Sequence, residues 1–414
     1  MSLVVGAKPT RRRIRRGLGL LGDSFSANCH SIGATVYGTE AYGYAGAIAA
    51  KTGLFPDYRD NQGKVGDHTG QFMARLPAAI ASATADLWLL LSRTNDSTTA
   101  GMSLADTKAN VMKLVTAFQN IPGKYLVVGT GTPRFGAKAL TGTALQEAID
   151  YKDWVLQYVS QFVPVVNIWD GFTEDMTVEG LHPNLLGADF IQSRVVPVIN
   201  ANFEFFGVPL PTDAADLYSA IRPFGCLNAN PLMTGTGGTI NASTNPVAGS
   251  VLADSYKASG SGLTGITTRW YKEPAAYGEA QVIELGGTMA AAGGYIYLQP
   301  AANVTLANLT ANDVIEMVSA PEIVGNSRGI LGWEAELIIN KPVAGTATTI
   351  YYRSMDKYQE PFTLPANWKG ALETQRYTYD ATETTISCRM GLYLATGIAQ
   401  DSKVKVAQFG LRKV

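Results

Sequence analysis

Two residues that stand far apart in the sequence have side chains suited to nucleophilic catalysis. Ser24 lies in the segment Gly22-Asp23-Ser24-Phe25-Ser26, and His182 lies in Glu179-Gly180-Leu181-His182-Pro183-Asn184. A serine hydroxyl is a poor nucleophile until a base removes its proton, and imidazole is a base that works near neutral pH. Because the chain has only 3 histidines, His182 is the first candidate for that base.

A third residue must hold the histidine in the correct tautomer. Glu179 stands three positions before His182, where its carboxylate can accept a hydrogen bond from the far ring nitrogen and stabilise the imidazolium. Asp175 is close enough in the sequence to do the same. We therefore expect Ser24, Glu179 and His182 to form a catalytic triad, with Asp175 as the alternative acid.

The first half of the chain has the pattern of an α/β fold. From about residue 14 to 206, short apolar runs alternate with helical periods, which predicts strand–helix units and a parallel sheet. Strands are expected at 18–21, 87–91, 125–129 and 163–169, with a weaker one near 57–61. Sites in such sheets lie at the carboxyl ends of strands, and Ser24 follows the first of these strands.

Helices are expected between these strands, which gives a five-stranded α/β/α sandwich of about 200 residues. Their apolar residues recur at helical spacing around residues 72–80 and 111–118, and a last helix is expected at 185–203. Ser103 and Thr143 are the predicted helix caps, because each is followed three residues later by Asp or Gln.

The second half has a different texture. After about residue 205, Gly/Thr/Ala/Asn-rich segments separate short alternating runs, such as 333–339 and 386–395. A two-residue period predicts half-buried antiparallel strands, and several of them predict a β-sandwich of jelly-roll type. We expect a hydrolytic domain at 1–207, a linker at 208–224 and a β-sandwich at 225–414, with a complete catalytic core in residues 1–212.

Composition excludes several classes of function. The chain of 414 residues has 33 basic and 34 acidic side chains and a net charge of −1, which gives no general attraction for nucleic acid. No apolar run is long enough to span a membrane, and the run after the arginine cluster at 11–16 is too short for a signal peptide. The expected location is the cytoplasm or a phage tail that acts on a bacterial surface.

The sequence also lacks the spacings that hold metals. It has no His-x-x-x-His or Cys-x-x-Cys pattern and no phosphate-binding loop, so we expect neither a metal nor a cofactor. The aromatic residues of the second half could stack on sugar rings, but core packing is the preferred interpretation for each of them: Trp270, Tyr271, Trp333 and Trp368.

Four segments resemble, in family order, the four motif blocks of the SGNH (GDSL) hydrolases. Gly22-Asp23-Ser24 is similar to the first block and the segment 61–69 to the second, with Gly66 five residues after Asn61. Thr94-Asn95-Asp96 resembles the third block, and 179–184 resembles the fourth. The resemblance covers roughly residues 14–206 and implies a flavodoxin-like three-layer α/β/α sandwich with a parallel sheet.

The resemblance also implies roles for individual residues. Ser24 would be the nucleophile, and the oxyanion would be held by the amides of Ser24 and Gly66 and by the Asn95 side chain.

At some positions this sequence differs from the usual family pattern. Where the family has glycine before x-Asn-Asp, this sequence has Arg93, which would narrow the pocket, bind an anionic substrate or point to solvent. His68 could line the cleft or belong to a solvated loop. The family usually has aspartate at the position of Glu179.

These expectations lead to a metal-independent serine esterase. The preferred substrate is an O-acetylated polysaccharide, because β-sandwiches commonly bind polymers. One alternative is an esterase or lipase for small or lipidic esters, with a C-terminal domain that serves stability or homo-oligomerisation. The other is a non-catalytic glycan-binding or structural module of a phage tail.

Overall fold

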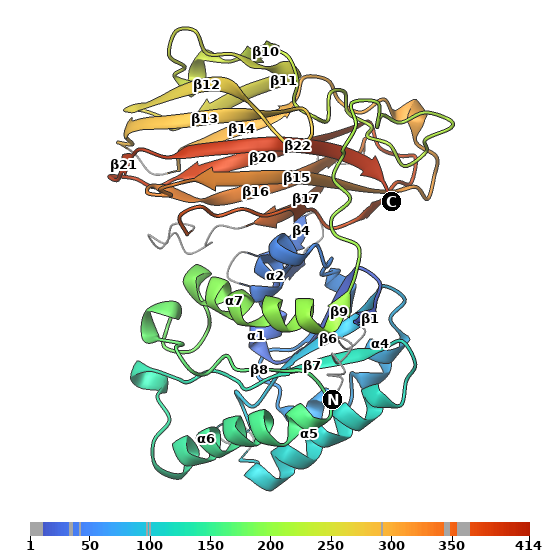
Figure 1. Ribbon diagram of the computed structural model, residues 1–414, viewed down its shortest axis with the longest axis vertical. Helices are drawn as coiled ribbons and strands as arrows, with labels where there is room; N and C mark the ends of the chain where they lie inside the picture. The colour runs from blue at the N-terminus through green and yellow to red at the C-terminus, as the bar shows by residue number, and fades with distance from the viewer. Residues whose placement is uncertain are drawn as a thin grey trace, which may run out of the picture.

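The computed structural model describes residues 11–32, 36–40, 43–96, 98, 101–290, 293–342, 348–353 and 365–414 (Figure 1). An α/β unit is built from the first half of the chain, and a unit of β-strands is built mostly from the second half. No helix in these ranges is both long and apolar enough to cross a membrane.

The α/β unit contains a parallel five-stranded sheet in the order β5-β2-β6-β7-β8. Its strands are β2 (Gly17–Gly22), β5 (Asn61–Gly63), β6 (Ala85–Leu91), β7 (Tyr125–Gly129) and β8 (Val165–Val166). This is the flavodoxin order, which confirms the predicted fold class. Two predicted strands differ in extent: β8 is much shorter than 163–169, and a 3₁₀ turn at 58–60 occupies most of the weak strand.

Helices cover both faces of this sheet. One face carries α1 (Ser24–Ala27), α2 (Tyr44–Thr52) and α7 (Leu185–Asn202), and the other carries α3 (Thr69–Phe72), α4 (Leu76–Ala81), α5 (Leu104–Gln119) and α6 (Gly142–Gln157). The central strands are buried on both sides, so alternate residues supply two separate cores: Leu87 and Leu89 face α2 and α7, whereas Trp88 and Leu90 face α5.

One of the two predicted helix caps is confirmed and the other is wrong. The Ser103 hydroxyl accepts a hydrogen bond from the amide of Asp106, so this predicted cap is confirmed. Thr143 is not a cap, because α6 begins one residue before it, after Thr141. The helical period at 72–80 belongs to two short helices. Short 3₁₀ helices complete the description: η1 (Tyr58–Asp60), η2 (Gly136–Lys138), η3 (Val159–Gln161), η4 (Glu174–Met176), η5 (Ala242–Thr244) and η6 (Leu306–Asn308).

The C-terminal part consists mainly of antiparallel strands in two sheets that share one core, as predicted. The first sheet has β10 (Gly237–Ile240), β11 (Leu252–Ser261), β14 (Tyr295–Pro300), β16 (Ile330–Asn340), β17 (Thr348–Arg353) and β20 (Thr385–Leu394). The second has β12 (Ile266–Pro274), β13 (Glu279–Thr288), β15 (Val314–Val324), β18 (Leu372–Glu373), β19 (Tyr377–Thr378), β21 (Ala399–Gln400) and β22 (Lys403–Lys413).

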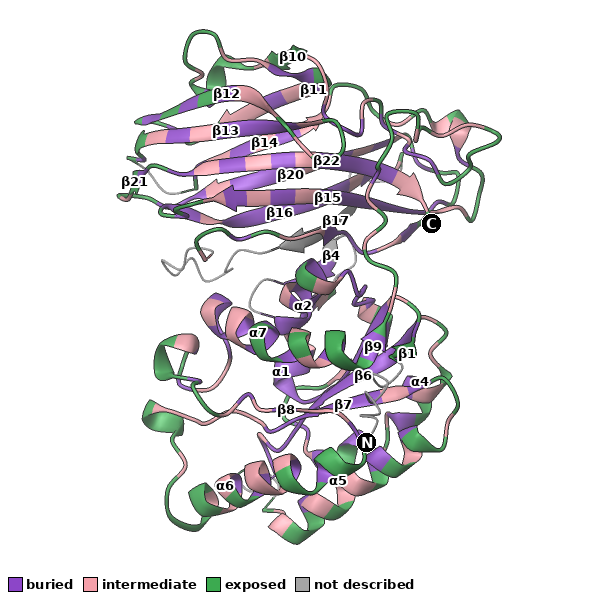
Figure 2. Cartoon of the chain, in the orientation of Figure 1, coloured by how far each residue is buried: buried purple, intermediate pink, exposed green. Residues whose placement is uncertain are grey.

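The tryptophans of this part belong to the core between the sheets. Trp270, Trp333 and Trp368 are all buried there, which supports packing over sugar stacking for these three. Figure 2 shows the buried positions alternating with less buried ones along the strands, which is the pattern of sheets with one inward face.

Two strands from the first half of the chain belong to a sheet of the C-terminal part. Directly after the helix that carries Ser24, β3 (His30–Ile32) and β4 (Val36–Thr39) form an antiparallel pair. β4 then pairs in parallel with β17, so the hairpin extends the first sheet of the C-terminal part to eight strands. Sequence reasoning missed this hairpin. A small parallel pair, β1 (Arg12–Arg13) with β9 (Phe203–Glu204), joins the two ends of the α/β unit.

Candidate active site

Ser24 stands at the start of α1, directly after β2. The Asp23 side chain caps this short helix by accepting a hydrogen bond from the Phe25 amide at 3.0 Å. The turn is tight: a Cβ at Gly22 would lie 2.5 Å from the Ser26 hydroxyl and 2.7 Å from the carbonyl oxygen of Leu91. Glycine is therefore needed here, and the turn presents Ser24 at the carboxyl edge of the sheet.

The nucleophile helix is fixed by buried polar contacts. The Ser26 hydroxyl lies 2.7 Å from the hydroxyl of Tyr44 on α2, and the Asn61 side-chain amide donates to the Ser26 carbonyl oxygen at 2.7 Å. The other contact of Asn61 is with His30, whose Nδ1 lies 2.9 Å from Asn61 Nδ2. These bonds restrict the motion of the segment that carries Ser24.

The structure brings Ser24, His182 and Glu179 together in one chain of hydrogen bonds. Nε2 of His182 lies 2.9 Å from the Ser24 hydroxyl oxygen, and Nδ1 of His182 contacts Oε1 of Glu179. The Phe25 ring packs beside the imidazole, with ring centroids 5.9 Å apart. The longer Glu179 side chain thus reaches the position where the family usually has aspartate.

A tight loop brings Glu179 and His182 to the same side. The Val178 amide donates to the His182 carbonyl oxygen at 2.9 Å, and Gly180 adopts a φ of 83°. A Cβ at Gly180 would lie 2.4 Å from the carbonyl oxygen of Phe135, so the loop can approach the β7–α6 connection only with glycine here. The Phe135 amide completes the contact by donating to the Gly180 carbonyl oxygen at 2.8 Å.

Asp175, the alternative acid, is engaged elsewhere. It is exposed, and its carboxylate accepts a hydrogen bond from the Thr173 hydroxyl at 2.5 Å. Its backbone carbonyl oxygen is bound by the Asn184 side chain at 2.7 Å, which helps to close the loop before α7. The geometry therefore favours Glu179 as the partner of His182.

Gly66 and Asn95 lie on the two loops expected to hold an oxyanion. Gly66 has a φ of 81°, and no atom lies within 4 Å of a Cβ built on it, so its backbone faces open space. Asn95 is largely buried, and its side-chain nitrogen donates to the Asp67 carbonyl oxygen at 3.0 Å. Since an amide carries two hydrogens, Asn95 keeps a second donor for a ligand.

Arg75 fixes the Gly66 loop, a role that sequence reasoning missed. Its guanidinium donates to the carbonyl oxygens of Gln62 at 2.6 Å and Gly22 at 3.0 Å, and it forms an ion pair with Asp67. It thereby ties the loop after β5 to the end of β2. Nothing in the sequence distinguished Arg75 from an ordinary helix-surface cation.

Asp96 fixes the Asn95 loop in a similar way. Its carboxylate accepts hydrogen bonds from the Thr69 hydroxyl and amide and, at 3.1 Å, from the Thr107 hydroxyl. These partners lie at the starts of α3 and α5. Asn95 is therefore held on a backbone anchored from two sides.

Arg93 is buried rather than solvent-exposed. Its φ is 84°, a left-handed conformation that explains why the family prefers glycine here. The guanidinium lies 5.8 Å from the centroid of the Tyr151 ring and 3.7 Å from the Glu147 carboxylate. Desolvation lowers the pKa of Arg93.

The other two histidines have structural contacts. The His68 side chain accepts a hydrogen bond from the Gly70 amide at 3.2 Å and thereby caps α3, which gives His68 a structural role. His30 Nε2 lies 2.8 Å from the Pro56 carbonyl oxygen. Burial lowers the pKa of His30 to about 4, whereas burial raises the pKa of Asp23 to about 6 against the opposing Phe25 amide bond.

A comparison with known proteins finds a matching family in the α/β unit. Residues 20–190 match the model of the GDSL-like Lipase/Acylhydrolase family. This region is a GDSL-like hydrolase domain. The match includes Ser24, Gly66, Asn95, Glu179 and His182, whereas the antiparallel C-terminal part lies outside it. No curated protein matches the chain.

Solved structures similar to the GDSL-like domain include three hydrolases. A carbohydrate esterase family 3 protein from Talaromyces cellulolyticus is 17% identical, with 45% of this chain and 96% of that chain covered and a TM-score of 0.34. An acetylxylan esterase from Geobacillus stearothermophilus is 18% identical, with 45% of this chain and 94% of that chain covered and a TM-score of 0.35. A lipase/acylhydrolase from Enterococcus faecalis is 19% identical, with 47% of this chain and 97% of that chain covered and a TM-score of 0.35.

The described residues contain no group of three or more His, Cys, Asp or Glu side chains arranged to hold a metal ion.

Proposed function

We propose that the protein is a serine esterase that works through an acyl-enzyme. The observation that carries this proposal is the hydrogen-bonded chain from the Ser24 hydroxyl through both ring nitrogens of His182 to the Glu179 carboxylate. Such an arrangement activates a hydroxyl that is otherwise inert near neutral pH.

The reaction begins with attack of the Ser24 oxygen on the ester carbonyl carbon. His182 Nε2 takes the hydroxyl proton, and Glu179 stabilises the imidazolium that forms. The carbonyl oxygen becomes negatively charged, and the amides of Ser24 and Gly66 and the Asn95 side chain donate hydrogen bonds to it. One such donor is worth about 3–4 kcal/mol of transition-state stabilisation in a related type of site.

The tetrahedral intermediate then collapses and releases the alcohol, which receives its proton from His182. Water enters on the same side, loses a proton to His182 and attacks the acyl-Ser24 ester. The second collapse releases the carboxylic acid and returns the proton to Ser24. The cycle needs no redox step.

Exposure of the triad favours a small acyl group and a large alcohol. Ser24 is 5% exposed, whereas the side chains of His182 and Glu179 are 30% and 40% exposed. The leaving alcohol must lie next to His182 to be protonated, so it occupies the open side, and the acyl group enters the more enclosed side at Ser24. An acetyl ester on a polysaccharide has this distribution of bulk.

We therefore propose O-deacetylation of a polysaccharide as the specific reaction. The hairpin that follows Ser24 pairs with the antiparallel C-terminal part, and this pairing would link a polymer-binding surface on that part to the segment that carries the nucleophile. A bacterial surface glycan, reached by a phage tail protein, is the polymer that we propose to test first.

Two measurements on the full chain test this function. The first is hydrolysis of aryl esters of C2 to C12 acids, for which we expect the highest kcat/KM at C2. The second is acetate release from acetylated polysaccharides, with the Ser24→Ala variant as control. A preference for chains longer than C4 would favour a lipid esterase, and no Ser24-dependent hydrolysis of any ester would contradict the proposal.

A further inference from the structure

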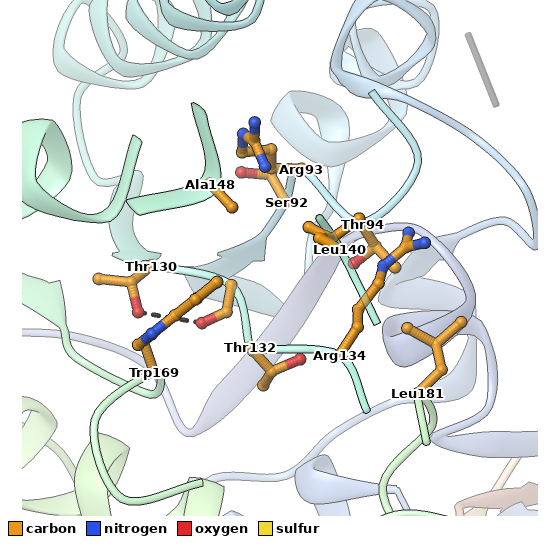
Figure 3. A pocket seen from close by; sticks show the side chains of 11 residues that line it. Ser92, Arg93, Thr94, Thr130, Thr132, Arg134, Leu140, Ala148, Trp169 and Leu181 are labelled. Atoms are coloured by element: carbon orange, nitrogen blue, oxygen red, sulfur yellow. Dashed lines mark hydrogen bonds between the residues drawn. The ribbon is translucent and has the colours of Figure 1, made fainter. Parts of the chain in front are cut away.

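A cavity next to the triad contains two arginines. The cavity is small, with a volume of about 20 Å³, and it opens to solvent between the loops that follow β6 and β7 and the loop that carries His182 (Figure 3). Thr94 and Leu181 line it, and they are the immediate neighbours of Asn95 and His182. A substrate bound at the catalytic groups could therefore extend a substituent to the mouth of this cavity.

Arg134 lies at the edge of this cavity, on the loop after β7. Figure 3 shows its side chain running from the loop towards Thr94, with Leu181 on its other side. The guanidinium has one hydrogen bond, to the Thr98 hydroxyl at 3.3 Å, and within the described ranges it forms no ion pair. Desolvation lowers the pKa of Arg134, although the buried Asp23 carboxylate opposes that change.

Arg93 closes the inner end of the same cavity. It is 7% exposed, and its Nε has no hydrogen-bond partner in the part of the chain that the structure describes. Among the described residues, one carboxylate lies within ion-pair distance of Arg93, that of Glu147 at 3.7 Å, and at this distance the two groups are not in close hydrogen-bonded contact. The positive charges of Arg93 and Arg134 also oppose each other. Two guanidiniums without a close carboxylate partner thus line one small cavity, and its mouth beside Arg134 is a favourable place for an anion.

We propose that Arg134, with Arg93 behind it, binds an anionic group on the alcohol portion of the substrate. The group is a carboxylate or phosphate on the sugar that carries the ester or on its neighbour. This inference rests on the proposed esterase function and specifies its substrate class as an acidic glycan. Guanidinium suits the role because its planar fork of donors matches carboxylate and phosphate oxygens.

The position of Arg134 explains why the anion belongs to the alcohol rather than to the acyl group. The loop of Arg134 contacts the catalytic loop through the hydrogen bond from the Phe135 amide to the Gly180 carbonyl oxygen. His182 protonates the leaving alcohol from that same loop. A sugar held at His182 can therefore extend a charged substituent towards Arg134 while its acetyl group stays at Ser24.

Arg134→Gln in the full chain tests the inference. Acetate release is measured on acetylated polygalacturonate, which is acidic, and on acetylated glucomannan, which is neutral. Loss of a hydrogen bond to a charged group predicts a fall of about 10- to 100-fold in the ratio of kcat/KM for the acidic over the neutral polymer, carried mainly by KM. Arg134→Lys should recover part of the ratio, because lysine keeps the positive charge but lacks the planar pair of guanidinium donors.

Lys138→Gln is the matched control. Lys138 lies four residues further along the same connection, is exposed and does not line the cavity, so this variant removes one positive charge without touching the proposed site. It should leave the ratio of the two kcat/KM values unchanged. An equal fall in both variants, or no fall in Arg134→Gln, would overturn the inference.

A binding measurement distinguishes failure of the acidic-glycan inference from failure of the proposed esterase function. Oligogalacturonate is titrated into the full chain and into Arg134→Gln, and weaker binding by the variant supports the inference even if no ester is hydrolysed. Ser24-dependent hydrolysis with no preference for the acidic polymer would leave the esterase standing and refute the acidic-glycan assignment.

Competing monosaccharides identify the anion. Glucuronate, glucose 6-phosphate and glucose are compared as inhibitors of 4-nitrophenyl acetate hydrolysis. Stronger inhibition by glucuronate assigns a carboxylate, and stronger inhibition by glucose 6-phosphate assigns a phosphate. Equal inhibition by all three contradicts the inference.

Discussion

The side chain of Gln375, in the C-terminal part, donates hydrogen bonds to the Thr39 hydroxyl at the end of β4, at 3.1 Å, and to the Pro56 carbonyl oxygen of the α/β unit, at 2.8 Å. Its Oε1 also accepts a hydrogen bond from the Tyr58 amide at 3.0 Å. Gln375 is fully buried, so three polar groups from the first half of the chain, on Thr39, Pro56 and Tyr58, depend on one residue of the second half.

Gln375→Ala in the full chain should therefore be destabilising. Each buried partner left without a hydrogen bond costs about 1–3 kcal/mol, so we expect a loss of at least about 2 kcal/mol in the free energy of unfolding, measured by urea denaturation. Gln281→Ala is the matched control, because it also removes a buried glutamine but one whose hydrogen-bond partners lie within the C-terminal part. Unchanged stability of Gln375→Ala would show that these contacts contribute little.

Truncation to residues 1–212 is expected to damage the site. Sequence reasoning predicted a complete core in this segment, but β4 would lose its partner strand β17, and Arg16 would lose its ion pair with Glu373. We expect low solubility or a marked fall in kcat for 4-nitrophenyl acetate, because the hairpin starts six residues after Ser24. A soluble fragment with the activity of the full chain would show that the hairpin is dispensable.

Glu179→Gln should lower kcat far more than Asp175→Asn. By analogy with the aspartate of serine proteases, loss of the carboxylate lowers kcat by up to about 10⁴ because the imidazole is no longer held or stabilised. Asp175→Asn keeps the hydrogen bonding of an exposed group and should change kcat less than about threefold. The reverse order would transfer the role to Asp175, and two small effects would indicate a Ser24–His182 dyad.

Asn95→Ala tests the oxyanion site. Loss of one donor should lower kcat by about 10²–10³ with little change in KM, since the bond strengthens only as charge develops. The side chain also donates to the Asp67 carbonyl oxygen, so thermal unfolding must be followed in parallel. A change in KM alone would indicate that Asn95 binds the ground state.

His30 predicts a specific pH dependence of stability. Its folded pKa is about 4, below the unfolded value near 6.5, so the unfolded state binds more protons between these pH values and stability falls as the pH falls through that window. The slope contributed by one proton is about 1.4 kcal/mol per pH unit.

Urea denaturation of the wild type and of His30→Gln as a function of pH should show a flatter dependence of stability on pH for the variant. Parallel profiles would contradict the buried neutral imidazole. Since Asp23, with its raised pKa, is present in both proteins, the difference isolates His30.

Sequence reasoning predicted the parts of the fold that depend on long periodic segments. The strands β2, β6 and β7 and the helices α5 and α7 are buried on continuous apolar faces, so their patterns are strong. The strands of the C-terminal part were anticipated from the alternation around Trp333 and Met390. The short strands β3 and β4 were not, because three or four residues carry no clear period and their partner β17 lies about 300 residues away.

The candidate site was predictable to the extent that short motifs define it. Ser24 and Glu179 to His182 stand in recognisable segments, and the structure brings them together. Arg75 and Arg134 act through contacts between distant loops, which no local spacing encodes. The left-handed conformation and burial of Arg93 are not predictable from its residue type, because glycine is the usual signal for that backbone.

Covalent trapping at Ser24 tests the central claim most directly. The full chain is treated with a fluorophosphonate, and the site of the adduct is found by peptide mass spectrometry. We expect one adduct, on Ser24, formed much more slowly in His182→Ala and absent in Ser24→Ala, with loss of 4-nitrophenyl acetate hydrolysis in proportion to labelling. Hydrolysis that persists in fully labelled protein, or an adduct on another residue with Ser24 unmodified, would contradict the assignment of Ser24 as the nucleophile.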